Sequence, residues 1–208
     1  MTKTVLTTDG RTVGDRGRQT RLLLLKNLVE ELAATGYRGT TVMGVARRSK
    51  TSPAAFYHYF PDIDLAILAL AQNVASAGSA SCSAETESIS PQDAPHRLTV
   101  AEAVQTFFAL YEEHRVVLRV IDMKSAEGDQ RFTELRRRFL RGLHADLSQA
   151  AQSAHPSAPA HAVASKVAPL VLMLAEVAAH DGELEEWSLD AEAVRTSAAE
   201  LVHTAITT

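Results

Sequence analysis

The chain has 208 residues, of which 46% are hydrophobic and 22% are charged, close to the mix of an ordinary globular protein. This length allows one large domain or two small ones, and the composition excludes a wholly disordered or collagen-like chain. A single cysteine, Cys82, excludes an internal disulfide framework and favours the cytoplasm. The longest apolar run, Val167–Ala175, is too short to span a bilayer, and no secretory signal follows Lys3, so we expect no membrane partner.

The net charge of −4 is unevenly distributed along the chain. Residues 1–64 carry ten Lys and Arg against six Asp and Glu, a net charge of +4, whereas the remainder carries 11 basic and 19 acidic residues, a net charge of −8. A basic N-terminal part on an acidic body indicates a polyanion partner for the N-terminal part only.

The N-terminal half is predicted to be helical after a polar arm at residues 1–16. A first helix is expected from Arg18 to Thr35 and should end at Gly36. Its apolar residues recur at helical spacing and should form its buried face: Leu22, Leu25, Leu28, Val29 and Leu32.

Two short helices should follow, each opened by capping residues. Thr40-Thr41 offers an N-cap for a helix from Val42 to about Ser49, and Thr51-Ser52-Pro53 opens a helix that ends at Tyr59. A longer helix is expected from Pro61-Asp62 to about Asn73. It should fade into a loop at 76–90, where small and polar residues dominate.

The C-terminal half is also predicted to be helical, which makes the chain all-α with about nine helices. Thr99 and Glu102 form a capping-box pattern that opens a helix, for which we expect a break near His114-Arg115 and a continuation to Lys124. The remaining helices should cover 128–154, 160–180 with a kink at Pro169, and a last helix capped by Ser188 or Asp190.

Residues 36–60 carry the functional signal, because two short helices joined by a tight turn make a helix-turn-helix. Phe56 and Phe60 should pack its second helix against Leu22, Leu25 and Val29, while Val42, Val45 and Ala46 pack the first. The outward face of the second helix would show Ser52, Pro53, Ala54, Tyr57 and His58, the kind of face that enters a DNA major groove. Arg47, Arg48 and Lys50 flank this face and are suited to phosphates.

The plainer interpretation is a core helical hairpin whose aromatic residues only pack. Three successive residues, Tyr57, His58 and Tyr59, cannot all face inward on one helix, so at least one is exposed. This favours a binding surface over pure core.

The segment Gly36-Tyr37-x-Gly-Thr-Thr-Val42, then Val45-Ala46, then Ser52-x-x-x-Phe56-Tyr57-x-Tyr59-Phe60 resembles the DNA-binding signature of the TetR/AcrR family of transcriptional regulators. The resemblance covers about residues 18–70. It implies that Thr41 caps the first motif helix and touches a phosphate, that Tyr57 contacts phosphate and that His58 contacts base or phosphate. It further implies bases or backbone as the partners of Thr51, Ser52, Pro53 and Ala54.

The sequence departs from that signature at two positions. The turn that usually reads Ala-Gly-Val is Ser49-Lys50-Thr51 here, so a lysine occupies the site where glycine permits a positive φ. The lysine that usually opens the next helix is Ile63, which removes one phosphate contact.

The resemblance also implies a homodimer, an operator of double-stranded DNA that we expect to be palindromic, and repression relieved by a small molecule. We therefore predict a DNA-binding domain at 17–64 and a ligand-binding and dimerisation domain at 65–208. Aromatic residues and methionines suit an adaptable apolar pocket for a hydrophobic effector. The candidate pocket residues are Phe107, Phe108, Tyr111, Leu118, Met123, Phe132, Leu135, Phe139, Met173 and Glu176.

The last two helices are the predicted dimer interface, because each has an apolar face that could join a four-helix contact. The residues of these faces are Val163, Val167, Leu170, Leu174, Val194, Ala198, Leu201 and Ala205. An internal core face is the alternative for the same residues.

No enzyme site is visible in the sequence. The eight histidines show no metal-ligand spacing, and no nucleophile motif or glycine-rich phosphate loop occurs, so we predict neither metal nor cofactor. Two rivals to the ligand-responsive repressor remain open: a helical small-molecule-binding protein, and a constitutive regulator without ligand control.

Overall fold

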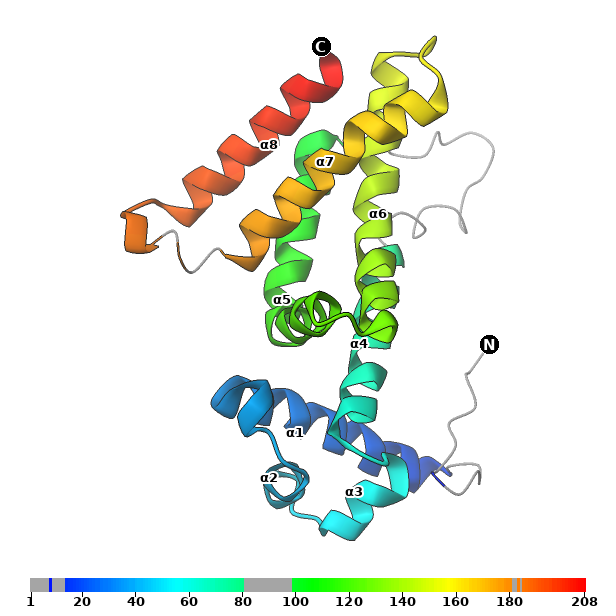
Figure 1. Ribbon diagram of the computed structural model, residues 1–208, viewed down its shortest axis with the longest axis vertical. Helices are drawn as coiled ribbons and strands as arrows, with labels where there is room; N and C mark the ends of the chain where they lie inside the picture. The colour runs from blue at the N-terminus through cyan, green and yellow to red at the C-terminus, as the bar shows by residue number, and fades with distance from the viewer. Residues whose placement is uncertain (1–7, 9–13, 81–98, 181–182, 184) are drawn as a thin grey trace. The chain divides into compact units, whose positions relative to one another are not determined.

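The computed structural model describes residues 8, 14–80, 99–180, 183 and 185–208, and within these residues every regular element is helical (Figure 1). This confirms the all-α fold class. The helices are α1 (Asp15–Gly39), α2 (Val42–Arg48), α3 (Pro53–Tyr59), α4 (Ile63–Ala80), α5 (Val100–Ala126), α6 (Gln130–Ala154), α7 (Ala160–Ala179), the 3₁₀ helix η2 (Glu185–Trp187) and α8 (Ala191–Thr207).

The helix starts follow the capping residues that the sequence offers. Thr41 accepts a hydrogen bond from the Gly44 N–H, and the Asp62 carboxylate accepts one from the Leu65 N–H. Asp190 caps α8. These side chains satisfy backbone donors that a helix leaves without partners, which favours the start of α2, α4 and α8 at these positions.

The capping box at the start of α5 is confirmed. The Glu102 carboxylate accepts the Thr99 N–H at 2.7 Å, and the Thr99 hydroxyl accepts the Glu102 N–H at 3.2 Å. The predicted loop after α4 begins later than expected, because α4 extends to Ala80. The rest of that loop lies outside the described residues.

The buried face of α1 contains Leu25, Leu28 and Leu32 as predicted, but it differs at Leu22. Leu24 and Leu28 are completely buried and pack in the same core as Phe56 and Phe60, but Leu22 is 60% exposed. Leu22 begins a run of four leucines that fits two helical registers, and the structure buries the register that begins at Leu24. The prediction that Leu22 packs against the second motif helix is therefore wrong.

Gly36 interrupts α1 as predicted but does not end it. Its φ of +68° lies in the left-handed region, and a further turn follows as far as Gly39. Glycine adopts this conformation without the steric cost that a Cβ would impose. The kink leads the chain toward the Thr41 cap.

The expected break near His114-Arg115 is wrong, because α5 is one helix throughout. Arg115 forms an ion pair with Glu112 one turn earlier, and Arg195 of α8 lies 3.7 Å from the same carboxylate. Charged residues that looked like an interruption are thus stabilised on the helix by their partners.

The core of the C-terminal helices is aromatic. The ring of Phe107 lies 5.9 Å from that of Phe108, 6.1 Å from that of Tyr111 and 5.8 Å from that of Phe139, in tilted geometries. Gly78 of α4 lies against Phe139, and a Cβ at this glycine would come within 2.5 Å of the ring. This cluster joins α4, α5 and α6.

By length and composition α7 is the one described helix that could cross a membrane. It also contributes core side chains, since Val167 and Leu174 are completely buried against neighbouring helices. Core helices of soluble proteins pass the same test, so α7 is weak evidence for a membrane span. The helix continues past Pro169.

The chain forms two compact units. The first contains residues 1–73 and 116–133, and the second contains residues 74–115 and 134–208. The first unit therefore takes in a segment that the predicted boundary at 64/65 assigns to the ligand-binding domain.

Candidate DNA-binding site

The helix-turn-helix predicted from residues 36–60 is formed by α2, a turn and α3. Ser52 accepts a hydrogen bond from the Ala55 N–H at 3.2 Å, and Pro53 occupies the first helical position. Proline has no N–H to leave unsatisfied there and has a φ suited to the helix. Phe56 is completely buried and holds α3 against α1.

The turn between α2 and α3 places Lys50 in the left-handed region, with a φ of +53°. This confirms the consequence expected from a lysine where related sequences carry glycine. The Thr51 N–H donates to the Ala46 carbonyl at 2.9 Å and the Lys50 N–H donates to the Arg47 carbonyl at 3.1 Å. These hydrogen bonds hold a non-glycine residue in a conformation that costs about 1–2 kcal/mol.

The outward face of α3 is exposed as predicted: Ser52, Pro53, Ala54, Tyr57 and His58 all lie on the surface. Tyr57 is 51% exposed, although its ring edge contacts Phe56. Of the other predicted DNA-contact residues, Thr41 is exposed and Thr51 is half-buried.

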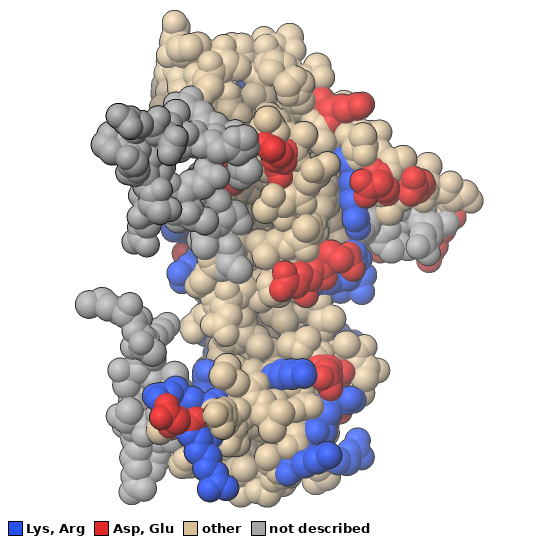
Figure 2. All heavy atoms as spheres, turned by 180° about the vertical axis from the view of Figure 1, so that it is seen from behind, with Lys and Arg blue, Asp and Glu red and all other residues tan. Residues whose placement is uncertain are grey.

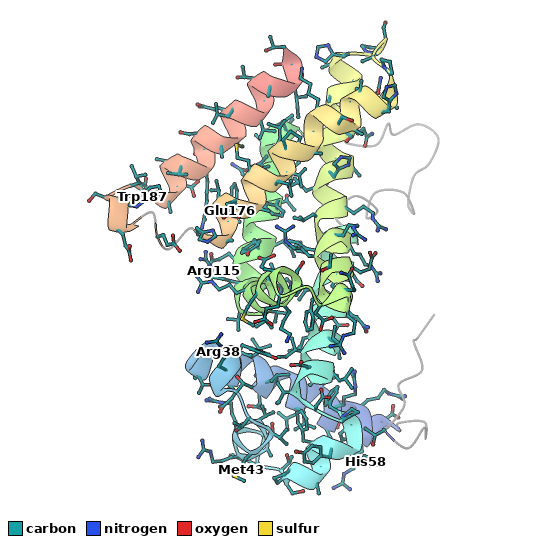
Figure 3. All side chains as sticks on the ribbon, in the orientation of Figure 1. Arg38, Met43, His58, Arg115, Glu176 and Trp187 are labelled. Carbon is teal, nitrogen blue, oxygen red and sulfur yellow. The ribbon has the colours of Figure 1, made fainter. Side chains whose placement is uncertain are left out.

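The sequence analysis missed Met43, which is 72% exposed and projects from α2 (Figure 3). The buried residues Val45 and Ala46 define the inner face of α2. Met43 and Arg47 are four residues apart on the outer face, so the helical period could have revealed Met43.

The three predicted cations have different surroundings. Arg47 and Lys50 are exposed and form no ion pair within the described residues. Arg48 instead binds the carboxylate of Glu31, with its Nε 3.1 Å and its Nη2 3.0 Å from Oε2. Because the Glu31 side chain is only 7% exposed, Arg48 compensates a buried charge and joins α2 to α1.

Gly44 makes room for this ion pair. A Cβ at position 44 would lie 2.1 Å from Oε1 of Glu31. Figure 2 shows several groups of Lys and Arg side chains, with a few Asp and Glu among them, on the face of the α1–α3 unit that it displays. Arg47 and Lys50 thus keep positive charge on the surface around α3, although Glu31 neutralises Arg48.

A second polar cluster, which the sequence pattern did not reveal, lies at the C-terminal end of α1 within the same compact unit. The Tyr37 hydroxyl donates to Oδ1 of Asp64 at 2.7 Å, and Nζ of Lys124 lies 3.7 Å from Oδ2. Nζ of Lys124 is also 5.2 Å from the centre of the Tyr37 ring. This Tyr37–Asp64–Lys124 cluster joins α1, α4 and the last turns of α5.

The cluster changes the proton affinity of two members. Burial, and then the hydrogen bond to Asp64, raise the pKa of Tyr37. Hydrogen bonding with Tyr37 and the nearby Asp64 charge raise the pKa of Lys124. Both shifts favour the protonated forms, a neutral phenol on Tyr37 and an ammonium cation on Lys124.

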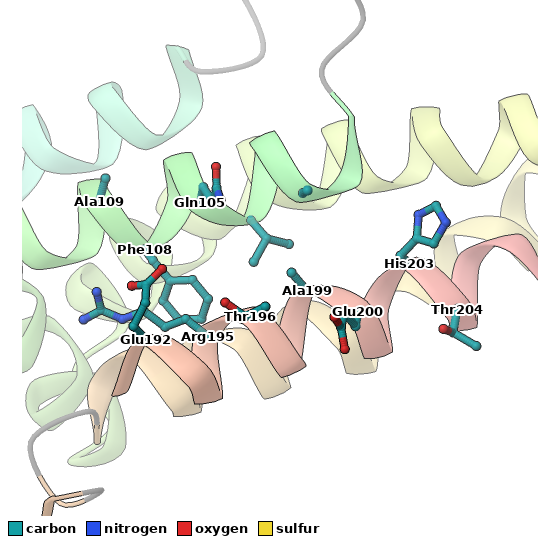
Figure 4. Close-up of a pocket in the computed structure, with 12 residues that line it drawn as sticks. Gln105, Phe108, Ala109, Glu192, Arg195, Thr196, Ala199, Glu200, His203 and Thr204 are labelled. Carbon is teal, nitrogen blue, oxygen red and sulfur yellow. The ribbon is translucent and has the colours of Figure 1, made fainter. Parts of the chain in front are cut away.

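A groove of about 730 Å³ lies between α5 and α8 in the second unit (Figure 4). Phe108, Ala109 and Val104 supply apolar surface, while Arg195, placed 5.7 Å above the Phe108 ring, supplies a charge. The other lining residues are Ala101, Gln105, Glu192, Thr196, Ala199, Glu200, His203 and Thr204.

This groove does not lie where the pocket was predicted. Of the predicted ligand residues, Phe108 alone lines it, while Phe107 and Phe139 line a much smaller cavity beside Gly78. The other large side chains form core instead, because aromatic and leucine side chains fill the space between α5 and α6: Tyr111, Leu118, Phe132 and Leu135. Met123 and Met173 are half-buried, and Glu176 is exposed.

Several residues of the predicted dimer face pack within the chain itself. Val163, Val167, Leu174 and Ala198 are buried in the single chain. Leu201 is 61% exposed. Leu170, Val194 and Ala205 are half-buried. The predicted apolar stripe of α7 is therefore mostly buried, whereas that of α8 is buried only at Ala198. The dimer interface stays a prediction.

Comparisons with known proteins extend this picture to the whole chain. Residues 24–64 match the family described as bacterial regulatory proteins, tetR family, and residues 92–208 match the tetracyclin repressor-like C-terminal domain. No curated protein matches the sequence significantly.

Several solved structures share the fold. GusR of Salmonella enterica superposes with a TM-score of 0.64 at 16% identity, over 91% of this chain and 96% of its own. A tetR-family regulator of Streptomyces coelicolor gives 0.70 at 13% identity, over 90% and 80%. FadR of Bacillus subtilis, in complex with stearoyl-CoA, gives 0.64 at 16% identity, over 88% and 98%.

The C-terminal match alone spans more than half of the chain, and the N-terminal match coincides with the capped helix-turn-helix. With its exposed α3 and basic surroundings, this unit has the parts of a DNA-binding module, and the chain belongs to the TetR family of bacterial regulatory proteins.

Proposed function

We propose that this DNA-binding transcriptional regulator acts in the cytoplasm as a homodimeric repressor that a small molecule releases from a palindromic operator. The observation that carries the proposal is the exposed face of α3, held by the Ser52 cap and the buried Phe56. A dimer would present two such faces to major grooves about 34–36 Å apart.

The role of the basic residues follows from their surroundings. Arg47 and Lys50 are available to phosphates on either side of α3, whereas Arg48 serves the Glu31 carboxylate. Tyr57 is placed to contact the DNA backbone beside them. Phosphate contacts of this kind fix the position of α3 on the duplex.

We place the effector in the groove between α5 and α8. Its apolar surface around Phe108 suits a hydrophobic body, and Arg195 offers a partner for a polar end. The stearoyl-CoA bound by FadR of Bacillus subtilis has that combination of a long apolar chain and an anionic group. A fatty acyl compound is therefore the first effector to test.

The test begins with selection of bound duplexes from a random DNA pool, followed by affinity measurements across a range of salt. We expect an enriched palindrome and a log–log salt slope of several units. Tyr57→Ala should weaken binding at least ten-fold without unfolding the protein, whereas Trp187→Ala, which truncates a still more exposed aromatic residue of η2, should not.

Three results would redirect the proposal. Failure to enrich any sequence would favour a helical small-molecule-binding protein. Enrichment without release by acyl compounds or other hydrophobic molecules would favour a constitutive regulator. Release that is unaffected by Phe108→Ala would move the effector away from the groove.

A further inference from the structure

The surface that α2 and α3 offer to DNA is unusually poor in hydrogen-bonding side chains. Residues 53–59 contain no Arg, Lys, Asn, Gln, Asp or Glu, and their exposed N-terminal members are Pro53 and Ala54. Met43 of α2 adds a third apolar side chain, 72% exposed. We refer to these three exposed side chains together as the apolar reading surface.

The polar residues on the N-terminal side of this surface offer few groups to a base edge. The Ser52 hydroxyl accepts the Ala55 N–H, and Oγ1 of Thr51 is buried in the turn. Lys50 is the single Lys or Arg between residues 49 and 60, and the left-handed turn carries it. Tyr57 and His58 follow one turn further along α3.

Base edges in the major groove differ in what they require from a protein. Guanine is recognised by Arg or Lys, adenine by Asn or Gln and cytosine by carboxylates, each through hydrogen bonds. Thymine differs from the others by its C5-methyl group, which apolar side chains contact. A surface of Met, Pro and Ala offers only the last kind of contact.

We propose that the apolar reading surface of Met43, Pro53 and Ala54 recognises the C5-methyl groups of thymines in each operator half-site. The inference rests on the proposed function, because it requires α3 in the major groove. The contacts are preorganised: Pro53 fixes its own φ, Ser52 caps the helix and Phe56 anchors it to the core. Specificity then arises mainly from shape and apolar contact at A·T base pairs.

The experiment deletes the methyl groups and nothing else. A duplex selected from the random pool is resynthesised with deoxyuridine in place of thymidine, first throughout and then at single positions. Each contacted methyl should contribute about three- to four-fold to affinity, the value expected for burying one methyl-sized group. Uracil outside the half-sites should have no effect and serves as the control.

Protein variants connect the effect to the named side chains. In Met43→Ala and Ala54→Gly, the loss of affinity caused by uracil should become smaller at one or two positions. The side chain that contacted the thymine methyl group there is absent from the variant, so removing the methyl group costs less. Met43 is so exposed that its truncation leaves the fold intact, and circular dichroism checks both variants.

The outcomes separate the two proposals. Equal affinity for the thymine and uracil duplexes would overturn methyl recognition while leaving sequence-specific DNA binding in place. A uracil penalty that persists unchanged in both variants would overturn the assignment to this surface. If no sequence is enriched at all, the proposed function itself fails.

Discussion

Lys50 shows how one side chain can disagree with its backbone and persist. Its φ of +53° is a conformation that glycine adopts freely and that a Cβ makes unfavourable. The residue also carries one of the exposed positive charges next to α3. We infer that the attraction of the Lys50 charge to DNA compensates for the stability that its left-handed backbone costs the fold.

Replacing Lys50 with glycine should separate these effects. Lys50→Gly is expected to raise the free energy of unfolding by up to about 1 kcal/mol, because relief of the left-handed strain exceeds the added chain entropy. The log–log salt slope of DNA binding should fall by about one. Urea denaturation and binding titrations measure the two quantities.

Lys50→Ala is the matched control, since it removes the charge but keeps a Cβ in the left-handed region. It should reduce the salt slope equally and bring no gain in stability. An unchanged slope in both variants would mean that Lys50 points away from the DNA.

Arg47 and Arg48 are neighbours in sequence with opposite expected roles. Arg48→Met should lower the free energy of unfolding by about 2 kcal/mol, because it leaves the buried Glu31 carboxylate without its partner. Arg47→Met should change stability by less than about 0.5 kcal/mol and instead weaken DNA binding, with a salt slope smaller by about one. If both variants lose stability equally, Arg47 has a structural role that its exposure does not reveal.

Sequence patterns predict residues whose partners are close along the chain. Thr41, Ser52 and Asp190 cap helices because their targets lie two or three residues away. Long-range partners carry no such signal. The Arg48–Glu31 ion pair spans 17 residues, and Lys124 is far from Tyr37, so both depend on the assembled fold.

The start of α6 depends on a carboxylate next to an arginine. Oδ1 of Asp129 accepts the Arg131 N–H at 3.0 Å, and the Arg131 guanidinium donates to both carboxylate oxygens, at 3.0 and 2.7 Å. These contacts lower the pKa of Asp129 from 3.8 to about 2. The stabilisation is complete above about pH 4 and is lost as the pH falls toward 2.

Asp129→Asn tests this pH dependence. The variant keeps a capping side chain but loses the charge, so it should be less stable than the unaltered protein at pH 7. The difference should narrow below pH 4 and disappear near pH 2, as followed by urea unfolding at a series of pH values. A difference that stays constant down to pH 2.5 would show that the neutral hydrogen bond, not the charge, stabilises α6.

Whether a helix can be predicted through a charged stretch depends on which partners its charged side chains find in the fold. The charged stretch of α5 indicated a break, yet its ion pairs with Glu112 keep it helical. The predicted apolar stripe of α7 is largely buried, whereas that of α8 is buried only at Ala198. Periodicity marks a face as buried without saying whether the neighbour is the same chain or a second copy.

For the whole molecule, the fold class could be predicted because helical period, caps and composition all agreed. The location of the groove could not, since it depends on which side chains fill the space between helices. A list of aromatic residues cannot distinguish the side chains that fill the core from those that line a cavity. In the structure Phe108, Phe132 and Leu135 are all buried, but only Phe108 of the three lines the groove.

Two exposed leucines, one on α7 and one on α8, allow a test of the oligomeric state. Leu172 of α7 and Leu201 of α8 are exposed, so Leu172→Arg or Leu201→Arg should yield folded monomers if these helices pair with a second copy. Sedimentation equilibrium measures the mass of each variant. Operator affinity should fall in the variants that no longer dimerise. Ala198→Arg is the contrasting variant: it places a charge in the core and should reduce the melting temperature. Dimers that persist in both leucine variants would locate the interface elsewhere.

The division of the chain at 73/74, 115/116 and 133/134 falls within α4, α5 and α6, so three unbroken helices pass from one unit to the other. The DNA-binding unit is consequently not a contiguous stretch of the gene. A chimaera that joined residues 1–73 to the C-terminal half of a relative would separate Tyr37 and Asp64 from Lys124. Exchange of DNA-binding specificity between such regulators therefore requires the recipient to bring its own compatible lysine, or the donor to contribute residues 116–133 as well.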